Sequence, residues 1–336
     1  MKKFLALIIA VVLAVSGLSV ISITANAATI FISGNYEYTV NSDDTVNIAG
    51  YKGIATDITI PSQILNKNVV KISDNSFYNN STLTSVKIPN TIKVVGSMAF
   101  HNCTKLSKVT LPSNLTEIGY NAFEGTTALT TITIPKTVTT AGNNVFNGSA
   151  LKTAAIENGA TAVADNLFSN AKNLTKVTIP NTVKKIGSMS FYDCTKLSSV
   201  TLPNTLTSIE TSAFENCQAM KSITIPKSVT YFGRTAVGYS DGIVIDGFII
   251  YGYKNTKAQT YATKNKITFK ALQEETVPVG DINNDGKIDV SDVTYLQMYL
   301  SGNSSYVIKN TKAADANGDG KIDVADVTKI QTIIAS

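Results

Sequence analysis

The chain has 336 residues and a formal net charge of +5, and 43% of its residues are hydrophobic. No run of lysine and arginine is dense enough to indicate a nucleic-acid-binding surface, and a chain of this length is expected to form two domains. The charge is unevenly divided, because residues 280–336 carry eight aspartates against five lysines, whereas residues 29–275 have a net charge of +6. We therefore expect the two parts to have different roles.

Residues 1–27 have the pattern of a secretory signal peptide. Lys2 and Lys3 precede an apolar run from Phe4 to about Val20, and the small residues of "TANA" suit cleavage near Ala27. No later segment approaches the ~20 consecutive apolar residues that a membrane-spanning helix requires. We therefore expect a secreted, extracellular protein without a membrane span.

A phenylalanine recurs through the body of the chain at a nearly constant interval. The successive steps are 23, 23, 23, 22, 23 and 23 residues, and prolines keep the same interval. The repeated residues are Phe77, Phe100, Phe123, Phe146, Phe168, Phe191 and Phe214. A fixed period of this length indicates a solenoid, in which successive coils stack on one another.

Each period contains a short strand followed by a turn. The stretch "LTKVTIP" alternates apolar and polar residues, which predicts that Leu174, Val177 and Ile179 are buried. Pro180 ends this strand because it has no N–H group for a ladder hydrogen bond. The next stretch, "NTVKKIGSMSF", turns the chain and returns Phe191 to the interior. A single coil cannot bury these side chains, so stacked coils about 4.8 Å apart are expected to share a continuous core.

The cysteines and the histidine lie in the repeated turns. Cys103, Cys194 and Cys217 each follow a repeat phenylalanine by three residues, where other coils have asparagine, threonine, serine or alanine. This position therefore requires only a small side chain, and the spacing allows a disulfide between Cys194 and Cys217 without requiring one. His101, the single histidine, occupies a variable turn position, so we expect no catalytic or metal-binding role for it.

The repeats resemble the BspA-like leucine-rich repeats, because the period, the proline after the strand and the recurring phenylalanine all match the repeat unit of that family. The resemblance covers about residues 56–270 and implies a β-rich solenoid with repeats of 22–23 residues. Residues 28–55 resemble the N-terminal β cap of that family, and "IIYGYKNTKAQTYATKNKITFKAL" resembles its C-terminal closing segment. Glu157 replaces the expected proline in one shortened coil, where we expect a local irregularity. The family consists mostly of surface or secreted interaction proteins, although a fold alone does not determine function.

The exposed strand positions of the solenoid form a polar, weakly basic surface of threonine, serine and lysine. Such a surface could form hydrogen bonds with a glycan or a protein, but threonine also suits a solvated pleated sheet. A glycosidase needs two facing carboxylates, and the acidic residues of the repeats are scattered among the turns. We therefore predict no catalytic residues and leave the ligand of the repeat surface open.

Two copies of an aspartate-rich loop lie near the end of the chain, and each opens with an aspartate. Side-chain oxygens fall at positions 1, 3, 5, 9 and 12 and glycine at position 6, which is the spacing of an EF-hand calcium loop. Position 7 coordinates through its backbone carbonyl, and position 12 is aspartate in place of glutamate. The predicted ligands of two calcium ions are Asp281, Asn283, Asp285, Lys287, Asp289 and Asp292, and Asp315, Asn317, Asp319, Lys321, Asp323 and Asp326.

An apolar stripe follows each loop and predicts a helix that leaves it. The stripes are Val293, Leu296 and Leu300 after the first loop, and Val327, Ile330 and Ile334 after the second. No helix is expected to enter the first loop. Duplicated loop–helix units of this kind resemble a type I dockerin, a small all-α domain with two EF-hand-like calcium loops. The resemblance covers residues 279–336, with residues 271–278 as a linker, and implies binding to a cohesin module of a cellulosome scaffoldin.

The dockerin resemblance also implies which residues contact the cohesin, namely loop positions 10 and 11 and the exposed helix residues behind them. These residues are Val290, Ser291, Thr294, Met298, Val324, Ala325, Thr328 and Thr332. Because the two halves are nearly the same, we expect docking through either helix. The poses are expected to differ in strength, since Tyr295 and Met298 in the first half correspond to Lys329 and Thr332 in the second.

These features together predict a secreted, non-catalytic, cellulosome-associated protein. Its dockerin would bind a cohesin in a calcium-dependent manner, and its solenoid would bind a protein or a carbohydrate, in support of plant polysaccharide degradation. One alternative is a polysaccharide-degrading glycoside hydrolase that the dockerin delivers. A second alternative is a displayed adhesin or inhibitor.

Overall fold

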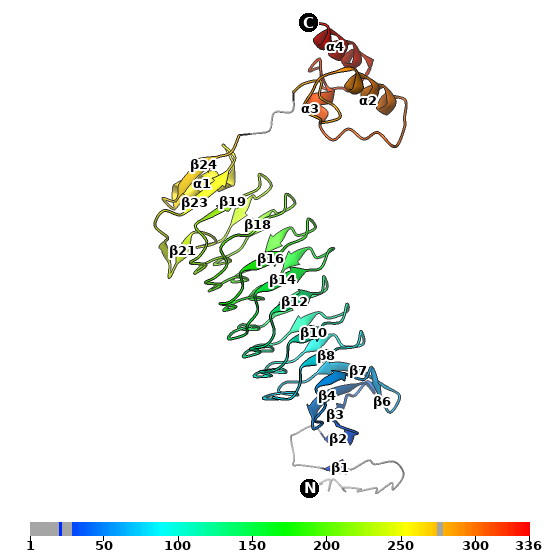
Figure 1. Cartoon of the computed structure of the whole chain (residues 1–336), viewed down its shortest axis with the longest axis vertical. Helices are drawn as coiled ribbons and strands as arrows, with labels where there is room; N and C mark the ends of the chain where they lie inside the picture. Colours follow the sequence, from blue (N-terminus) through cyan, green and yellow to red (C-terminus); the bar gives the residue numbers. More distant parts are fainter. Residues whose placement is uncertain (1–19, 22–28, 274–277) are drawn as a thin grey trace, which may run out of the picture. The chain divides into compact units, whose positions relative to one another are not determined.

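The computed structural model describes residues 20–21, 29–273 and 278–336. These residues form two compact units that divide after Leu272, a β-solenoid and a small helical unit (Figure 1). The predicted signal peptide, residues 1–27, lies outside the described residues apart from β1 (Val20–Ile21). Within the described ranges, no helix is long and apolar enough to cross a membrane.

The solenoid begins with an antiparallel meander. β2 (Ile30–Ser33), β3 (Tyr36–Val40) and β4 (Val46–Tyr51) pair in sequence order. β4 then pairs in parallel with β7 (Lys67–Ile72), and β7 also pairs antiparallel with the short strand β6 (Gln63–Ile64). The meander therefore covers the first coil with hydrogen-bonded backbone, as the resemblance to an N-terminal β cap implies.

The coils that follow supply two ladders of short parallel strands. The strands of the first ladder are β5 (Asp57–Thr59), β8 (Ser85–Lys87), β10 (Lys108–Thr110), β12 (Thr131–Ile134), β14 (Thr153–Ile156), β16 (Lys176–Thr178) and β19 (Ser222–Thr224). This ladder is divided between β10 and β12 and again between β16 and β19. The strands of the second ladder are β9 (Val94–Val95), β11 (Glu117–Ile118), β13 (Thr140–Ala141), β15 (Ala162–Val163), β17 (Lys185–Ile186), β18 (Ser208–Ile209) and β20 (Tyr231–Phe232). The chain is thus a β-solenoid, as the sequence predicts.

The last coil is closed by a hairpin and a strand–helix–strand unit. β21 (Tyr239–Ser240) and β22 (Ile243–Val244) form the hairpin. β23 (Ile249–Gly252) pairs with β19 and β24 (Thr268–Ala271), and α1 (Lys257–Lys264) connects β23 to β24. The buried side chains of α1 are alanines, so the helix packs closely over the end of the core.

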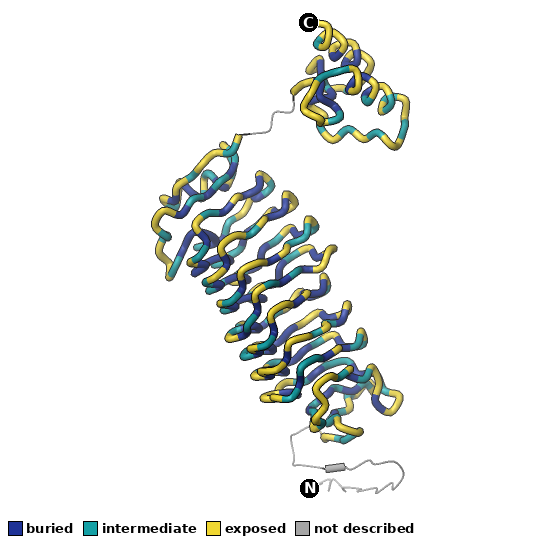
Figure 2. The backbone as a smooth tube through the Cα atoms, viewed as in Figure 1, coloured by how far each residue is buried: buried dark blue, intermediate teal, exposed yellow. Residues whose placement is uncertain are grey.

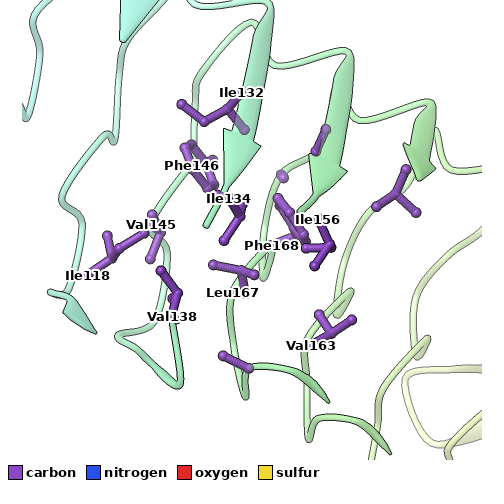
Figure 3. Packing of buried hydrophobic residues seen from close by; sticks show 14 of the residues in the cluster. Ile118, Ile132, Ile134, Val138, Val145, Phe146, Ile156, Val163, Leu167 and Phe168 are labelled. Atoms are coloured by element: carbon purple, nitrogen blue, oxygen red, sulfur yellow. The ribbon is translucent and has the colours of Figure 1, made fainter. Parts of the chain in front are cut away.

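The repeat phenylalanines form one continuous column inside the solenoid, of which Figure 3 shows Phe146 and Phe168. Figure 2 shows that buried residues recur in every coil. From Phe77 to Phe214 each ring is buried, and successive ring centroids lie 4.9–5.8 Å apart with interplanar angles of 4–21°. Burying one such side chain contributes about 1.5–3 kcal/mol. The column therefore links every coil to its two neighbours, and the predicted period is confirmed.

The coil that contains Glu157 is irregular on one side. The second ladder is interrupted between β13 and β15, whereas β12, β14 and β16 stay paired in the first. The backbone N–H of Glu157, which a proline would lack, donates a hydrogen bond to the Ile134 carbonyl at 2.9 Å. Its carboxylate accepts a hydrogen bond from the Lys136 N–H at 3.0 Å. The missing proline is thus replaced by two hydrogen bonds to the preceding coil.

The helical unit contains α2 (Val290–Leu300), α3 (Thr311–Ala314) and α4 (Val324–Ile334). Its core is a cluster of buried apolar side chains from the loops and both long helices. These side chains are Ile282, Val293, Leu296, Ala314, Ala316, Val327 and Ile330. The predicted stripes are confirmed except at Ile334, which is 38% exposed in the last turn of α4.

Candidate metal-binding and docking sites

Each aspartate-rich loop runs directly into a capped helix. Asp289 is the N-cap of α2 and accepts a hydrogen bond from the Ser291 N–H, while the Asp292 carboxylate accepts one from the Asp289 N–H at 3.0 Å. Asp323 and Asp326 repeat this capping box on α4. An acidic side chain in the first turn also interacts favourably with the helix dipole. Positions 9 and 12 of each loop therefore fix where the helix begins.

The first loop (residues 281–292) wraps around two buried carboxylates. Asp281 is 2% exposed and accepts hydrogen bonds from the N–H groups of Asp285 and Gly286 at 3.1 and 3.0 Å. Asp292 is fully buried and accepts from the N–H groups of Ile282 and Asn283 at 2.7 and 3.0 Å. The loop therefore surrounds both carboxylates with backbone donors.

The second loop (residues 315–326) has a similar arrangement. Asp326 is fully buried and accepts from the Asn317 N–H at 3.1 Å, and Asp315 accepts from the Gly320 N–H at 2.9 Å. The other carboxylate oxygen of Asp315, Oδ1, is buried and has no hydrogen-bond partner. A buried carboxylate oxygen without a partner is costly and requires a compensating group.

The central glycines of the loops are needed for their backbone conformation. Gly286 and Gly320 have φ angles of 86° and 85°, in the left-handed region. A Cβ atom at either position would meet no other atom within 4 Å, so space does not limit these positions. The hydroxyl group of Ser291, together with its N–H group, hydrogen-bonds to Asp289 and lowers the pKa of that carboxyl group. The second loop lacks this hydroxyl because Ala325 stands there.

The remaining predicted ligands lie at the loop surface. Asn283 and Asn317 donate their side-chain amides to Asp285 and Asp319, both at 3.0 Å. Over the described residues, no three or more histidine, cysteine, aspartate or glutamate side chains are gathered so that they could hold a metal ion. The carboxylates are instead turned toward the loop N–H groups. The twelve predicted ligands, with Lys287 and Lys321 coordinating through their carbonyls, therefore stay a prediction.

The predicted cohesin-contact residues lie on the outer side of α2 and α4. Val290 is 72% exposed and Val324 is 70% exposed, and each is the first residue of its helix. Ser291, Thr294, Ala325, Thr328 and Thr332 are exposed as well, and Met298 is half-buried. The structure therefore presents two similar exposed surfaces, each with a valine at the first residue of its helix.

That the two docking poses differ in strength stays a prediction, and Tyr295 on α2 also has structural contacts. The Tyr295 ring is half-buried, packs edge-on against Tyr306 at 4.9 Å, and donates its hydroxyl to the Val307 carbonyl at 3.3 Å. Tyr295 thus holds the segment between the two halves. Lys329, its counterpart on α4, is exposed.

In the solenoid, the cysteines have structural contacts. The thiols of Cys103, Cys194 and Cys217 are free and buried, and each donates to a phenylalanine carbonyl of the preceding coil at 3.1–3.2 Å. Burial raises the pKa of Cys103 to about 12 and also raises the pKa values of the other two thiols. Because the thiolate is the reactive form, these residues are unsuited to nucleophilic catalysis.

The turn histidine also packs against neighbouring coils. The His101 ring stacks on Tyr78 at 5.0 Å with an interplanar angle of 3°, and its Nδ1 atom lies 3.3 Å from the Glu124 carboxylate. Glu124 also accepts a hydrogen bond from the Asn147 side chain in the next coil at 2.8 Å. These contacts tie adjacent turns together.

A shallow groove of about 660 Å³ crosses the first ladder at β12, β14 and β16. Its lining includes threonines of successive coils, together with Lys176, Glu157 and the small side chain of Ala155. The predicted polar, hydroxyl-rich surface is thus hollowed where the irregular coil lies.

Comparison with known proteins agrees with this architecture. The family model described as BspA type leucine rich repeat region matches residues 54–175 and 161–243, in six copies, and the model described as dockerin type I domain matches residues 279–334. No curated protein matches the chain.

Several solved structures of bacterial leucine-rich repeat proteins are similar to the chain. A leucine rich cell surface protein from Faecalibacterium prausnitzii is 30% identical, with 63% of this chain and 74% of that chain covered and a TM-score of 0.44. A leucine-rich repeat protein from Bacteroides ovatus is 25% identical, covering 72% and 67% of the two chains, with a TM-score of 0.51. The T. pallidum leucine rich repeat protein is 26% identical, covering 70% and 95%, with a TM-score of 0.47.

Proposed function

Because the chain belongs to the BspA-type leucine-rich repeat family and ends in a dockerin type I domain, we propose that it is a secreted, non-catalytic component of a cellulosome. In this proposal the dockerin binds a cohesin module of a scaffoldin in a calcium-dependent manner. The solenoid binds a protein or carbohydrate ligand, and the assembly serves the degradation of plant polysaccharides.

The observation that carries this proposal is the exposure of Val290 and Val324, each at the first residue of a helix that an aspartate-rich loop holds in place. When a partner covers an apolar side chain that is about 70% exposed, the removal of its surface from water favours binding. The valines are flanked by Ser291 and Ala325, which are too small to obstruct a close approach. The two helices therefore offer two similar docking surfaces, as the dockerin resemblance implies.

Calcium binding by the two loops fits their chemistry. The sequence of each loop contains four aspartates and one lysine, so the loop carries excess negative charge that a bound cation would offset. The buried, unpartnered Oδ1 atom of Asp315 has the chemistry of a calcium ligand. Asp281 and Asp315 at position 1 and Asp292 and Asp326 at position 12 would hold the ions. A bound calcium ion would offset most of the negative charge of each loop and fix the N-terminal ends of α2 and α4.

The contacts of the acidic residues in the solenoid support a non-catalytic role. Glu157 accepts from the Lys136 N–H, and Asp165 accepts from the Ser188 N–H at 2.9 Å. The buried Glu215 accepts from the Gly242 N–H at 2.8 Å. These carboxylates hold turns and neighbouring coils together.

The experiment that tests the proposal is calorimetric titration of the chain with a panel of type I cohesins, in calcium and then in EDTA. We expect binding of one cohesin per chain in calcium and loss of that binding in EDTA. Incubation of the chain with plant polysaccharides should release no reducing sugar. If the panel shows no binding in calcium, the proposed docking is wrong, and if the chain releases sugar, the non-catalytic role is wrong.

A further inference from the structure

A second groove lies at the C-terminal end of the solenoid, between the last coil and α1. Its volume is about 650 Å³, within the usual range of small-molecule sites. β20 and the turn after it form one wall, and α1 supplies Lys257, Thr260, Tyr261 and Lys264 to the other. We call it the terminal groove.

The floor of the terminal groove is held rigidly. Tyr261 stacks on Phe232 at 4.5 Å, and its hydroxyl donates to the Val237 carbonyl at 3.2 Å. The Tyr239 hydroxyl donates to the Asn265 side chain at 2.8 Å. Burial raises the pKa of both tyrosines, so their hydroxyls stay neutral. The groove is therefore formed before any ligand arrives.

Two residues of the last coil depart from the repeat where they line this groove. Tyr231 pairs in register with Ser208, and the earlier coils have Lys185 and then Ala162 at that position. Arg234 stands where the two preceding coils have threonine and serine, at Thr211 and Ser188, and it is the only arginine in the chain. Other coils have side chains as different as Ala162, Lys185 and Ser208 at the Tyr231 position, and Ser188, Thr211 and Tyr120 at the Arg234 position, so folding of a coil does not require a tyrosine at the first or an arginine at the second.

The cations of the terminal groove have no carboxylate partners. None of the ion pairs within the described parts of the chain includes Arg234, Lys257 or Lys264, and all three side chains are exposed. Glu215 contacts two lining residues, but it is buried and its oxygens accept from the Thr235 hydroxyl and the Gly242 N–H, both at 2.8 Å. The groove therefore presents net positive charge to a ligand.

The spacing of these cations indicates an extended anion. Lys257 and Lys264 are seven residues apart on one side of α1, about 10 Å along the helix axis. A single compact anion cannot contact both ammonium groups closely, whereas a chain with repeated negative groups can. The arginine fork opposite them suits a carboxylate, which it can bind through two parallel hydrogen bonds.

The remaining lining suits a polyhydroxylated ring. Tyr231 is 51% exposed and lies at the groove wall, where its ring can pack against a sugar face. The hydroxyls of Thr230 and Thr260 donate to backbone carbonyls at 3.3 and 3.2 Å, so each keeps lone pairs for a ligand hydroxyl.

We propose that the terminal groove binds an oligosaccharide of uronic acid residues, with Arg234, Lys257 and Lys264 on its carboxylates and Tyr231 against a sugar ring. The inference rests on the proposed role of the solenoid as a ligand-binding module. It is independent of cohesin docking, because every residue involved lies in the solenoid unit.

The test is calorimetric titration of the full-length chain with trigalacturonic acid, without added calcium so that calcium bridges between uronates do not contribute. The methyl ester of the same trisaccharide keeps the sugar and removes the charge, and a triglutamate peptide keeps the charge and removes the sugar. We expect binding of the free acid alone, which weakens as salt is added. The same protein is titrated with cohesin in calcium, which separates this inference from docking.

Variants assign the binding to the groove. Arg234→Ala is expected to weaken binding at least tenfold, as for loss of a charge-assisted hydrogen bond, and Tyr231→Ser, which restores the residue of the preceding coil, should weaken it several-fold. Lys254→Ala is the control for loss of one positive charge, because Lys254 is exposed and does not line the groove. Tyr120→Ala is the control for loss of an exposed tyrosine, because Tyr120 lies in a distant coil. Neither control should change binding.

Three results would overturn the inference. The first is absence of binding by the free acid. The second is equal binding of the methyl ester, the triglutamate peptide or inorganic phosphate, which would make the groove a general surface for sugars or anions. The third is unchanged binding in Arg234→Ala when its melting temperature matches that of the unaltered chain.

Discussion

Removing one ring from the phenylalanine column tests how the solenoid is stabilised. Phe168 is fully buried, and its ring centroid lies 5.8 Å from that of Phe146 and 5.5 Å from that of Phe191. Phe168→Ala therefore opens a cavity between neighbouring coils. These coils cannot move closer to fill it, because the hydrogen bonds of their strand ladders hold them at a fixed spacing. Substitutions of this kind cost about 3–5 kcal/mol, whereas Phe168→Leu, which keeps most of the volume, should cost less than about 1.5 kcal/mol.

The assay is equilibrium unfolding in urea, followed by circular dichroism. Tyr120→Ala is the matched control, because that aromatic side chain is 59% exposed and its removal should change the free energy of unfolding by no more than about 0.5 kcal/mol. The reasoning would be refuted if Phe168→Ala were no more destabilising than the control. It would also be refuted if the leucine and alanine variants were equally unstable.

Three further predictions concern the helical unit and the thiols. An isolated segment of residues 279–336 should gain helix content on addition of calcium and lose it in EDTA, as circular dichroism would show, because binding is coupled to folding of the loops. Asp315→Ala should lower the calcium stoichiometry measured by calorimetry from two ions to one, and an unchanged stoichiometry would remove Asp315 from the ligand set. Since burial raises the pKa of Cys103 to about 12, no thiol should react with a disulfide reagent at pH 8 in the native chain. All three should react in urea, whereas a single reactive thiol would indicate a Cys194–Cys217 disulfide.

The repeat architecture could be predicted from the sequence because its determinants are local and recur. A buried phenylalanine in every period leaves few ways to place successive coils other than stacking them. The irregular coil was predictable as well, since Glu157 stands where a proline was expected, and the second ladder is interrupted in that coil. The loop spacing and the apolar stripes likewise led to the helices that begin at Val290 and Val324.

Features that depend on packing between distant segments could not be predicted. Tyr231 and Arg234 look like ordinary turn variation until α1, which comes after the hairpin and β23, packs opposite them and closes the terminal groove. Tyr295 looks like a surface residue of a helix, but its hydroxyl bonds to Val307 in the segment between the two halves. The one available signal for the groove was that Arg234 is the only arginine in the chain.

The most direct test of the docking proposal uses its two exposed valines. A charge placed in a contact that excludes water costs several kcal/mol, so Val290→Asp and Val324→Asp should each block one surface and leave the other. In calorimetric titrations with cohesin in calcium, we predict modest weakening by either substitution alone and loss of binding in the double variant. Undiminished binding by the double variant would contradict docking through α2 and α4, and complete loss in one single variant would contradict docking through either helix.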